Sequence, residues 1–225
     1  MLDRLELLIG KDNIEKIKNS NITVLGLGGV GGYVVEALVR CGVSNITIVD
    51  FDKVEESNLN RQIIATRDKI GCSKTDLFKE RILSINAEVN VKDVSLFVDE
   101  SNIDSLFTKR VDYFIDACDC INTKKLVIDR CLKNDVKFIT SMGTGNRMDP
   151  SKLAIIDIRK TSNDPIAKIL RKYIKDNRIN KKIMTLCSSE VPIRKGKVVG
   201  SNSFVPASAG LLIASFVVRD IIKTL

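Results

Sequence analysis

Charged and amide side chains recur just after apolar segments in the first half of this sequence. They are Asp50, Asp52, Asn58, Arg61, Lys74 and Asp119, and they follow a turn that contains Gly26, Gly28, Gly29 and Gly31. Glycines alone indicate only that a nucleotide binds. Phosphates require cations, and Mg²⁺ requires carboxylate oxygens. The set therefore suits a nucleotide triphosphate with its metal better than a redox dinucleotide.

The segments around the glycines supply the context that such a turn requires. Residues 22–25 are an apolar run that predicts a strand, and helical spacing predicts a helix over 30–39. Gly26 and Gly28 allow a tight turn close to a phosphate, and Gly31 allows the helix to pack against the strand. The helix N-terminus adds free N–H groups. A turn without a ligand is the alternative, but the full context favours a nucleotide.

The other polar residues follow predicted strands or open predicted helices. We expect strands over 46–50 and 111–116, and helices over 74–85 and 122–132. Asp50 lies 19 residues beyond Gly31, near the spacing at which an acid reaches a ribose hydroxyl. Residues past the carboxyl ends of parallel strands converge on one crevice, so Arg61, Lys74 and Asp119 should meet there.

Each of these residues also has an ordinary structural alternative. Arg61 and Lys74 could be solvated surface cations, which is the common position for such side chains. Asn58 could form a turn, and Asp119 could be the N-cap of the following helix. Each alternative is acceptable for a single residue. Together they do not explain why all four residues occur at these spacings.

These motifs resemble those of the ubiquitin-activating-enzyme-like family of adenylating enzymes, which includes ThiF, MoeB and HesA. The resemblance rests on Gly-x-Gly-Gly-x-Gly, Asp-Phe-Asp, Ser-Asn-Leu-x-Arg-Gln, Gly-x-x-Lys and a later Asp, in order between about residues 10 and 140. It implies that Asp50 holds the ATP ribose and that Asp119 holds Mg²⁺. It also implies that Asn58, Arg61 and Lys74 contact the phosphates.

The resemblance extends to the remaining parts of the implied site. The glycines and Asp52 would complete the ATP site, and Arg61, Lys74 and Asp119 would act in catalysis. Arg4 stands where the family often has an arginine that reaches into the partner subunit's site. The resemblance therefore implies a homodimer.

Composition fits one α/β domain. A chain of 225 residues with 44% hydrophobic content can bury a sizeable core. Apolar runs alternate with helical patterns, which predicts a Rossmann-like, doubly wound, mostly parallel sheet with helices on both faces. We divide it into an ATP-binding part, residues 1–146, and a basic, substrate-binding elaboration with a C-terminal core helix, residues 147–225.

Cysteine and histidine usage narrows the chemistry. The six cysteines form no Cys-x-x-Cys pair and the sequence has no histidine, which excludes a Cys₄ zinc site and Ser–His or Cys–His catalysis. Without a recognisable signal peptide, we expect unpaired thiols and a cytoplasmic location. Cys187 lies in a basic stretch that we interpret as a loop, and we expect no catalytic role for it. Residues 198–218 are too polar to span a membrane, and 211–222 predict a buried helix.

All of the net positive charge lies in one segment. Residues 147–197 hold 14 Lys and Arg against 5 Asp and Glu, a balance of +9, whereas the rest of the chain is close to neutral. A helix predicted there has an apolar stripe made of Ile166, Ile169, Leu170, Tyr173 and Ile174. The cations expected to contact a phosphate backbone are Lys168, Arg171, Lys172, Lys175, Lys181 and Lys182. A lysine-rich solvated face is an equally good reading of the helix alone.

The last third of the chain resembles one branch of the family, the tRNA threonylcarbamoyladenosine dehydratases. The motifs are Asp-Ile-Arg-Lys-Thr-x-x-Asp-Pro at 157–165, Ser-Ser-Glu-x-Pro at 188–192 and Gly-Ser-x-Ser-Phe-Val-Pro at 200–206. This resemblance implies ATP-dependent dehydration of N6-threonylcarbamoyladenosine in a tRNA anticodon loop. The reaction would pass through an acyl-adenylate that the neighbouring carbamoyl group attacks, closing a ring.

Three alternatives remain open on sequence. A sulfur-carrier adenylyltransferase shares the chemistry, but it commonly carries paired Cys-x-x-Cys motifs that are missing here. An NAD-dependent oxidoreductase would leave Arg61 and Lys74 unexplained. A non-catalytic RNA-binding scaffold would keep only the fold. Partner expectations are the modified tRNA and sulfur-relay proteins, with no membrane.

Overall fold

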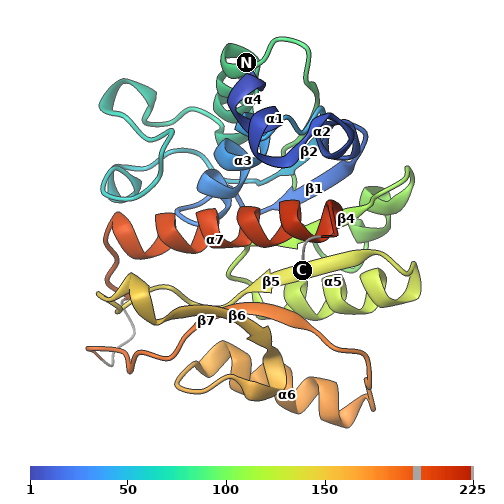
Figure 1. Cartoon of the computed structure of the whole chain (residues 1–225). Coiled ribbons are helices and arrows are strands. Elements are labelled where there is room, and N and C mark those ends of the chain that lie inside the picture. Colours follow the sequence, from blue (N-terminus) through green and yellow to red (C-terminus); the bar gives the residue numbers. More distant parts are fainter. Residues whose placement is uncertain (195–198, 224–225) are drawn as a thin grey trace.

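A seven-stranded sheet runs through the computed structural model, which describes residues 1–194 and 199–223 (Figure 1). The strands are β1 (Asn21–Leu25), β2 (Asn45–Val49), β3 (Asn90–Val94), β4 (Tyr113–Asp116), β5 (Lys137–Ser141), β6 (Leu153–Asp157) and β7 (Met184–Ser188). Their order across the sheet is β3-β2-β1-β4-β5-β7-β6. β6 runs antiparallel to β7, and the other pairs are parallel.

The direction of the chain reverses between β1 and β4. From β1 the chain moves to β2 and β3 on one side, then returns to place β4 and β5 on the other side. The loops that leave β1 and β4 therefore diverge, which opens a crevice at their carboxyl ends. The predicted doubly wound, mostly parallel α/β fold is confirmed.

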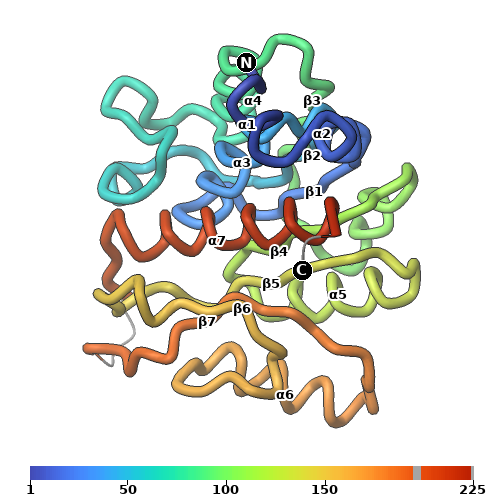
Figure 2. The backbone as a smooth tube through the Cα atoms, in the orientation of Figure 1, coloured from blue at the N-terminus to red at the C-terminus, as the bar shows by residue number. Residues whose placement is uncertain are grey.

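Helices cover both faces of the sheet (Figures 1 and 2). They are α1 (Asp3–Ile9), α2 (Lys11–Lys18), α3 (Gly31–Arg40), α4 (Lys74–Ile85), α5 (Ile121–Lys133), α6 (Pro165–Asp176) and α7 (Phe204–Ile221). Short 3₁₀ helices span Glu56–Asn58, Arg67–Lys69, Ile103–Phe107, Pro150–Lys152 and Ile158–Lys160. The largest buried cluster joins α3, α4 and α7 to one face, while α5 and α6 pack on the other.

The strands and helices predicted around the glycine turn are all present, within a few residues of the expected bounds. Two local interpretations are wrong. Cys187 is buried in β7 instead of lying in a loop. Ile169 is 42% exposed, because α6 buries the neighbouring face that carries Ala167, Leu170 and Ile174. The end of the basic segment, residues 195–197, lies outside the described residues.

Helix α7 is long and apolar enough, by length and composition alone, to cross a membrane. Its position explains the composition differently, because it lies along the sheet against α3 and contributes Val205, Ala209, Ile213 and Val217 to the core (Figure 1). Gly210 allows the closest approach. A Cβ at this position would lie 2.4 Å from the carbonyl oxygen of Val30.

Replacing Gly210 with alanine should therefore destabilise the fold. The added methyl group must push α7 away from the start of α3, and overpacking of this kind typically costs about 1–3 kcal/mol. Urea unfolding measures the loss. Ser215→Ala, an exposed change on the same helix, is the control, and equal stability of the two variants would contradict the close packing.

Candidate nucleotide-binding site

A cleft of about 530 Å³ opens at the carboxyl ends of β1, β2, β4 and β5. Its lining includes most of the residues predicted from sequence: Gly26, Gly28, Gly29, Asp50, Asp52, Asn58, Arg61, Lys74 and Asp119. The prediction that these residues converge on one crevice is therefore confirmed as geometry. Gly31 lies just behind the lining, and Arg4 lies elsewhere.

The glycine turn brings two loops to within backbone contact. Gly26 has a φ of +89°, and a Cβ there would lie 2.7 Å from the backbone nitrogen of Cys118. A Cβ on Gly31 would lie 1.7 Å from the carbonyl oxygen of Gly26. Side chains at these positions would separate the first βα turn from the loop after β4. The turn thus leaves room for a ligand to approach the N-terminus of α3.

Asp50 is oriented by the turn that it faces. One carboxylate oxygen accepts the N–H of Leu27 at 2.6 Å, and the other accepts the N–H of Asp52 at 2.8 Å. The residue is 7% exposed and lines the cleft. Each carboxylate oxygen can accept more than one hydrogen bond, so Asp50 keeps capacity for a ligand hydroxyl.

Two cations face the cleft from the β2 side. Lys74, 4% exposed, donates to Asp52 across 2.8 Å at the start of α4. Arg61 donates to the carbonyl oxygen of Ser57 at 2.6 Å and to Asn60 Oδ1 at 2.9 Å. These contacts fix both side chains while leaving part of each cation facing the cleft, as phosphate binding requires.

Asn58 has the turn-forming contacts that its ordinary alternative predicted. Its Oδ1 accepts the N–H of Glu55 at 3.2 Å, which closes a capping box around a 3₁₀ turn. It is also 6% exposed and lines the cleft. Capping the 3₁₀ turn is compatible with contacting a ligand, because the cap orients the Asn58 amide at the cleft wall.

Gln62 was not singled out as a site residue from sequence. It is 7% exposed and lines the cleft, and its Oε1 is a buried atom without a hydrogen-bond partner among the described residues. An unsatisfied buried acceptor is costly unless something donates to it. Its place directly after Arg61 was the available signal in the sequence.

A buried ion pair supports the loop that carries Asp119. Lys124 Nζ lies 3.0 Å from Asp116 Oδ2, and both side chains are fully buried. Thr140 donates to the same oxygen at 2.6 Å, and the N–H of Cys118 donates to Oδ1 at 3.2 Å. Burial alone would lower the pKa of Lys124, but the Asp116 carboxylate offsets this effect and the pKa is raised. The exposed Asp119 thus stands on a fixed loop.

Arg4 belongs to α1, at the opposite end of the sheet. The neighbouring Leu2 packs against Gly42, just before β2 begins. The cleft lies at the other end of β2, so Arg4 does not reach the cleft of its own chain. A contribution to a partner's cleft stays a prediction.

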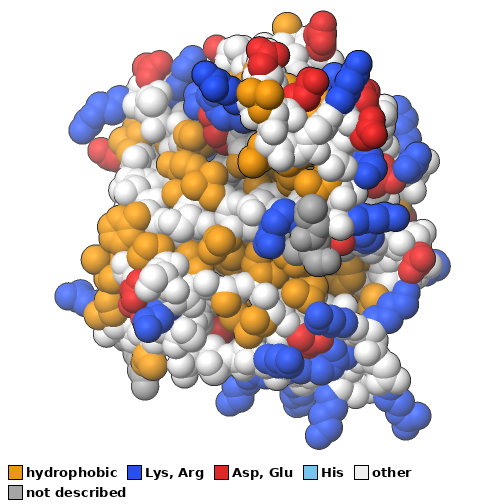
Figure 3. Space-filling model, in the orientation of Figure 1, with side chains coloured by type: hydrophobic (Ala, Val, Ile, Leu, Met, Phe, Trp, Pro, Cys, Tyr) orange, Lys and Arg blue, Asp and Glu red, His pale blue; other side chains and the backbone are white. Residues whose placement is uncertain are grey.

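The predicted nucleic-acid contacts lie on and near α6. Lys and Arg side chains gather at the lower edge of the molecule, where α6 lies (Figures 1 and 3). Lys168, Lys172, Lys175 and Lys182 are exposed. Arg171 instead donates to the carbonyl oxygen of Thr161 at 3.0 Å, and Lys181 pairs with Asp135 at 2.8 Å. Arg171 therefore fixes α6 to the preceding loop.

Cys187 does not line the cleft among the described residues. Burial raises the pKa of its thiol, and the charge of Asp164 adds to this effect. A buried, neutral thiol is a poor nucleophile. The structure supports the expectation that Cys187 takes no part in catalysis.

Residues 2–223 match the ThiF family. This protein belongs to the ThiF family. The tRNA threonylcarbamoyladenosine dehydratase of Bacillus subtilis is 41% identical over an alignment of 238 residues including gaps. The alignment covers 98% of this chain and 94% of that protein. The Escherichia coli protein of the same name is 37% identical over 76% of this chain and 63% of its own length.

Solved structures extend the match to the fold of this ThiF-family chain. The structure of E. coli tRNA N6-threonylcarbamoyladenosine dehydratase, TcdA, in complex with ATP superposes with a TM-score of 0.92 at 32% identity. The match covers 97% of this chain and 92% of that one. A complex of the same enzyme with AMP gives the same TM-score. The whole described fold is therefore that of a ThiF-family enzyme structure.

Gln62→Met should separate ligand binding from stability. The change removes an unsatisfied acceptor while keeping the side-chain length, so the free energy of unfolding should stay the same or rise by about 1 kcal/mol. Affinity for ATP should fall at least about tenfold, because a hydrogen bond to the ligand is lost. Urea unfolding and calorimetric titration measure the two quantities. A destabilised variant with unchanged ATP affinity would show that the acceptor has no ligand.

Proposed function

We propose that this protein is a tRNA threonylcarbamoyladenosine dehydratase that uses ATP to cyclise N6-threonylcarbamoyladenosine. The proposal is carried by one observation. The cleft gathers the carboxylate of Asp50 and the cations Lys74 and Arg61 around an open glycine turn. It does so in a chain that matches, over nearly its whole length, a relative of that name and an ATP-bound structure.

The residues of the cleft fit ATP. The glycine turn and the start of α3 would hold phosphate oxygens, and Asp50 would hold the ribose. The unpartnered Gln62 Oε1 is a further point where a donor is needed. An NAD-dependent oxidoreductase would not use the two cations that Asp52, Ser57 and Asn60 hold at the cleft.

We further propose that Mg²⁺ accompanies the ATP and that Asp119 binds it. No group of three His, Cys, Asp or Glu side chains in residues 1–194 and 199–223 could hold a metal ion alone. Mg²⁺ commonly needs only one or two carboxylates when phosphate oxygens and waters complete its shell. Asp119, exposed on the loop fixed by Asp116, fits that role.

In the proposed reaction the threonyl carboxylate of the tRNA attacks the α-phosphate of ATP. Pyrophosphate leaves and an acyl-adenylate forms. A nitrogen or oxygen of the adjacent carbamoyl group then attacks the acyl carbon and displaces AMP, so the nucleoside loses one water overall. The two reacting groups are already tethered, and their intramolecular reaction requires mainly positioning. This accounts for catalysis in a chain that has no histidine and for the absence of a role for the buried Cys187 thiol.

The exposed lysines of α6 supply the proposed contact with the tRNA backbone. Lys168, Lys172 and Lys175 project from the helix, and its first residues reach the cleft through Ile166. A phosphate backbone bound along α6 would thus lead toward the cleft. The alternative interpretation, an ordinary solvated face rich in lysine, does not explain why the basic helix leads to the cleft.

We also propose a homodimer, formed through the outer face of α7. Phe204, Leu211 and Leu212 recur at helical spacing and are 42%, 49% and 39% exposed. Figure 3 shows hydrophobic side chains in a band across the face over which α7 runs. A second copy that packs on this band would bury its apolar side chains. The dimer would also contain a second Arg4, the residue expected to reach into the partner's site.

Leu211→Asp should convert the protein to a monomer. A carboxylate at the centre of an apolar interface is costly to desolvate. Light scattering should give twice the 25.0 kDa chain mass for the unaltered protein and for Leu83→Asp, an exposed change on α4. It should give the single mass for Leu211→Asp. A wild-type protein that is monomeric would refute the dimer.

Asp119→Ala should greatly lower the dehydratase activity without affecting tRNA binding. Removing the proposed metal ligand should lower the rate at least about a hundredfold, since charge stabilisation at the phosphate is lost. The assay incubates enzyme, ATP, Mg²⁺ and threonylcarbamoylated tRNA, and mass spectrometry of the digest detects the nucleoside lighter by one water. Filter binding measures tRNA affinity. If the unaltered enzyme yields no such nucleoside, the proposed function fails.

A further inference from the structure

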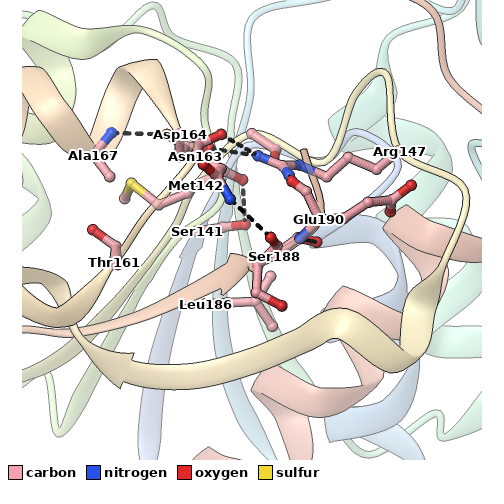
Figure 4. Close-up of polar contacts among 12 residues, drawn as sticks. Ser141, Met142, Arg147, Thr161, Asn163, Asp164, Ala167, Leu186, Ser188 and Glu190 are labelled. Carbon is pink, nitrogen blue, oxygen red and sulfur yellow. Dashed lines mark hydrogen bonds and ion pairs between the residues drawn. The ribbon is translucent and has the colours of Figure 1, made fainter. Parts of the chain in front are cut away.

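Arg147 is a buried cation in the loop that follows β5. It is 3% exposed, and its guanidinium contacts oxygens from three separate segments (Figure 4). Nε donates to the carbonyl oxygen of Gly143 at 3.2 Å, and Nη1 donates to that of Glu190. Nη2 donates to the carbonyl oxygen of Asn163 at 3.1 Å and lies 3.5 Å from Asp164 Oδ2.

These contacts connect the loop to the starts of two helices. Asp164 is the N-cap of α6, where its Oδ1 accepts the N–H of Ala167 at 2.8 Å. On the other side, Asn202 donates to the carbonyl oxygen of Arg147 at 2.7 Å and accepts the N–H of Val205 at 2.9 Å. One residue therefore fixes the loop after β5 relative to α6 and α7.

The segment held in this way is one wall of the cleft. Residues 143–145 line it on the β5 side, away from Asp50 and Lys74. Gly145 packs so closely on the returning chain that a Cβ would lie 2.1 Å from Val199 Cγ1. The N–H of Asn146 donates to the carbonyl oxygen of Gly200 at 2.8 Å, which fixes the wall from outside.

Among the residues that the structure describes, this wall carries no charged side chain. It presents the backbone of residues 143–145 together with Thr144, Ile166 and Val199. Arg147 is the cation nearest in sequence, but its guanidinium is already occupied and buried. A carboxylate that must attack phosphorus would be stabilised in its ground state by a free cation, which would raise the barrier. A neutral wall avoids that cost.

We propose that Arg147 is a positioning residue that holds residues 143–145 as the binding wall for the threonylcarbamoyl group. It makes no contact with the substrate itself and acts through the wall. The identity of the ligand rests on the proposed function, whereas the separation of this wall from the ATP side rests on the geometry of the cleft.

Arg147→Lys tests the proposal, because lysine keeps the charge but cannot donate in three directions from one plane. We expect KM for threonylcarbamoylated tRNA to rise at least about tenfold, since buried carbonyl groups lose their partner and the wall shifts. The dissociation constant for ATP should change less than twofold. Arg81→Lys, at a salt bridge between α3 and α4, is the matched control and should change neither constant.

A second variant reaches the same wall without touching the cation. Gly145→Ala must displace the wall from Val199, so it should reproduce the rise in KM with unchanged ATP binding. If Arg147→Lys fails to fold, Gly145→Ala still tests whether the wall binds the threonylcarbamoyl group. Hydrogen exchange should show faster exchange in residues 142–149 of Arg147→Lys than in Arg81→Lys.

Loss of ATP affinity in parallel with KM, or an unchanged KM in a folded Arg147→Lys or Gly145→Ala variant, would overturn the proposal. Failure of the proposed function is distinguishable from this result. In that case the unaltered enzyme itself would yield no dehydrated nucleoside, while the exchange difference in residues 142–149 would remain measurable.

Discussion

The buried pair between Asp116 and Lys124 is the interaction on which the site depends. Two charges without solvent are stable only as partners, and removing one member of such a pair typically costs about 3–5 kcal/mol. The pair stands at the end of β4, at the point where the sheet changes direction, and Thr140 extends it to β5. It thereby fixes α5, two central strands and the loop that carries Asp119 in one arrangement.

Around this point the cleft is electrically asymmetric. The β2 side presents Lys74 and Arg61, each partly neutralised by neighbouring oxygens, whereas the described residues on the β5 side present backbone and neutral side chains such as Thr144. Such a division suits two ligands of different chemistry, a polyphosphate and an acid that must react with it. The division follows from topology, because the two sides belong to strands on opposite sides of the crossover.

Local patterns predicted the elements that hold the nucleotide side. The strand before Gly26 and the helix after it have clear apolar periods, and neighbouring residues determine such periods. The contacts of Arg147 could not be predicted in this way, because its partners lie up to 55 positions away in sequence. Lys124 left a fainter signal. It shares a helical face with Val127, Ile128 and Cys131, and a cation on an apolar face implies a buried partner.

The errors have the same origin. Cys187 stands among basic residues in sequence, yet it is a β7 residue, because pairing with β5 and the antiparallel β6 decides its environment. The stripe on α6 was misjudged at Ile169, since the packing of α5 and the sheet, rather than hydrophobicity alone, selects the buried face.

The contact between Gly210 and Val30 has a consequence for synthesis of the protein. A chain emerges from the ribosome N-terminal end first, and domains begin to fold as they emerge. The first βα unit therefore emerges well before α7, the helix that covers α3. The apolar side of α3 must therefore stay uncovered until residues 204–221 have been made. Until then the nascent nucleotide fold would expose an apolar surface of the kind that chaperones recognise.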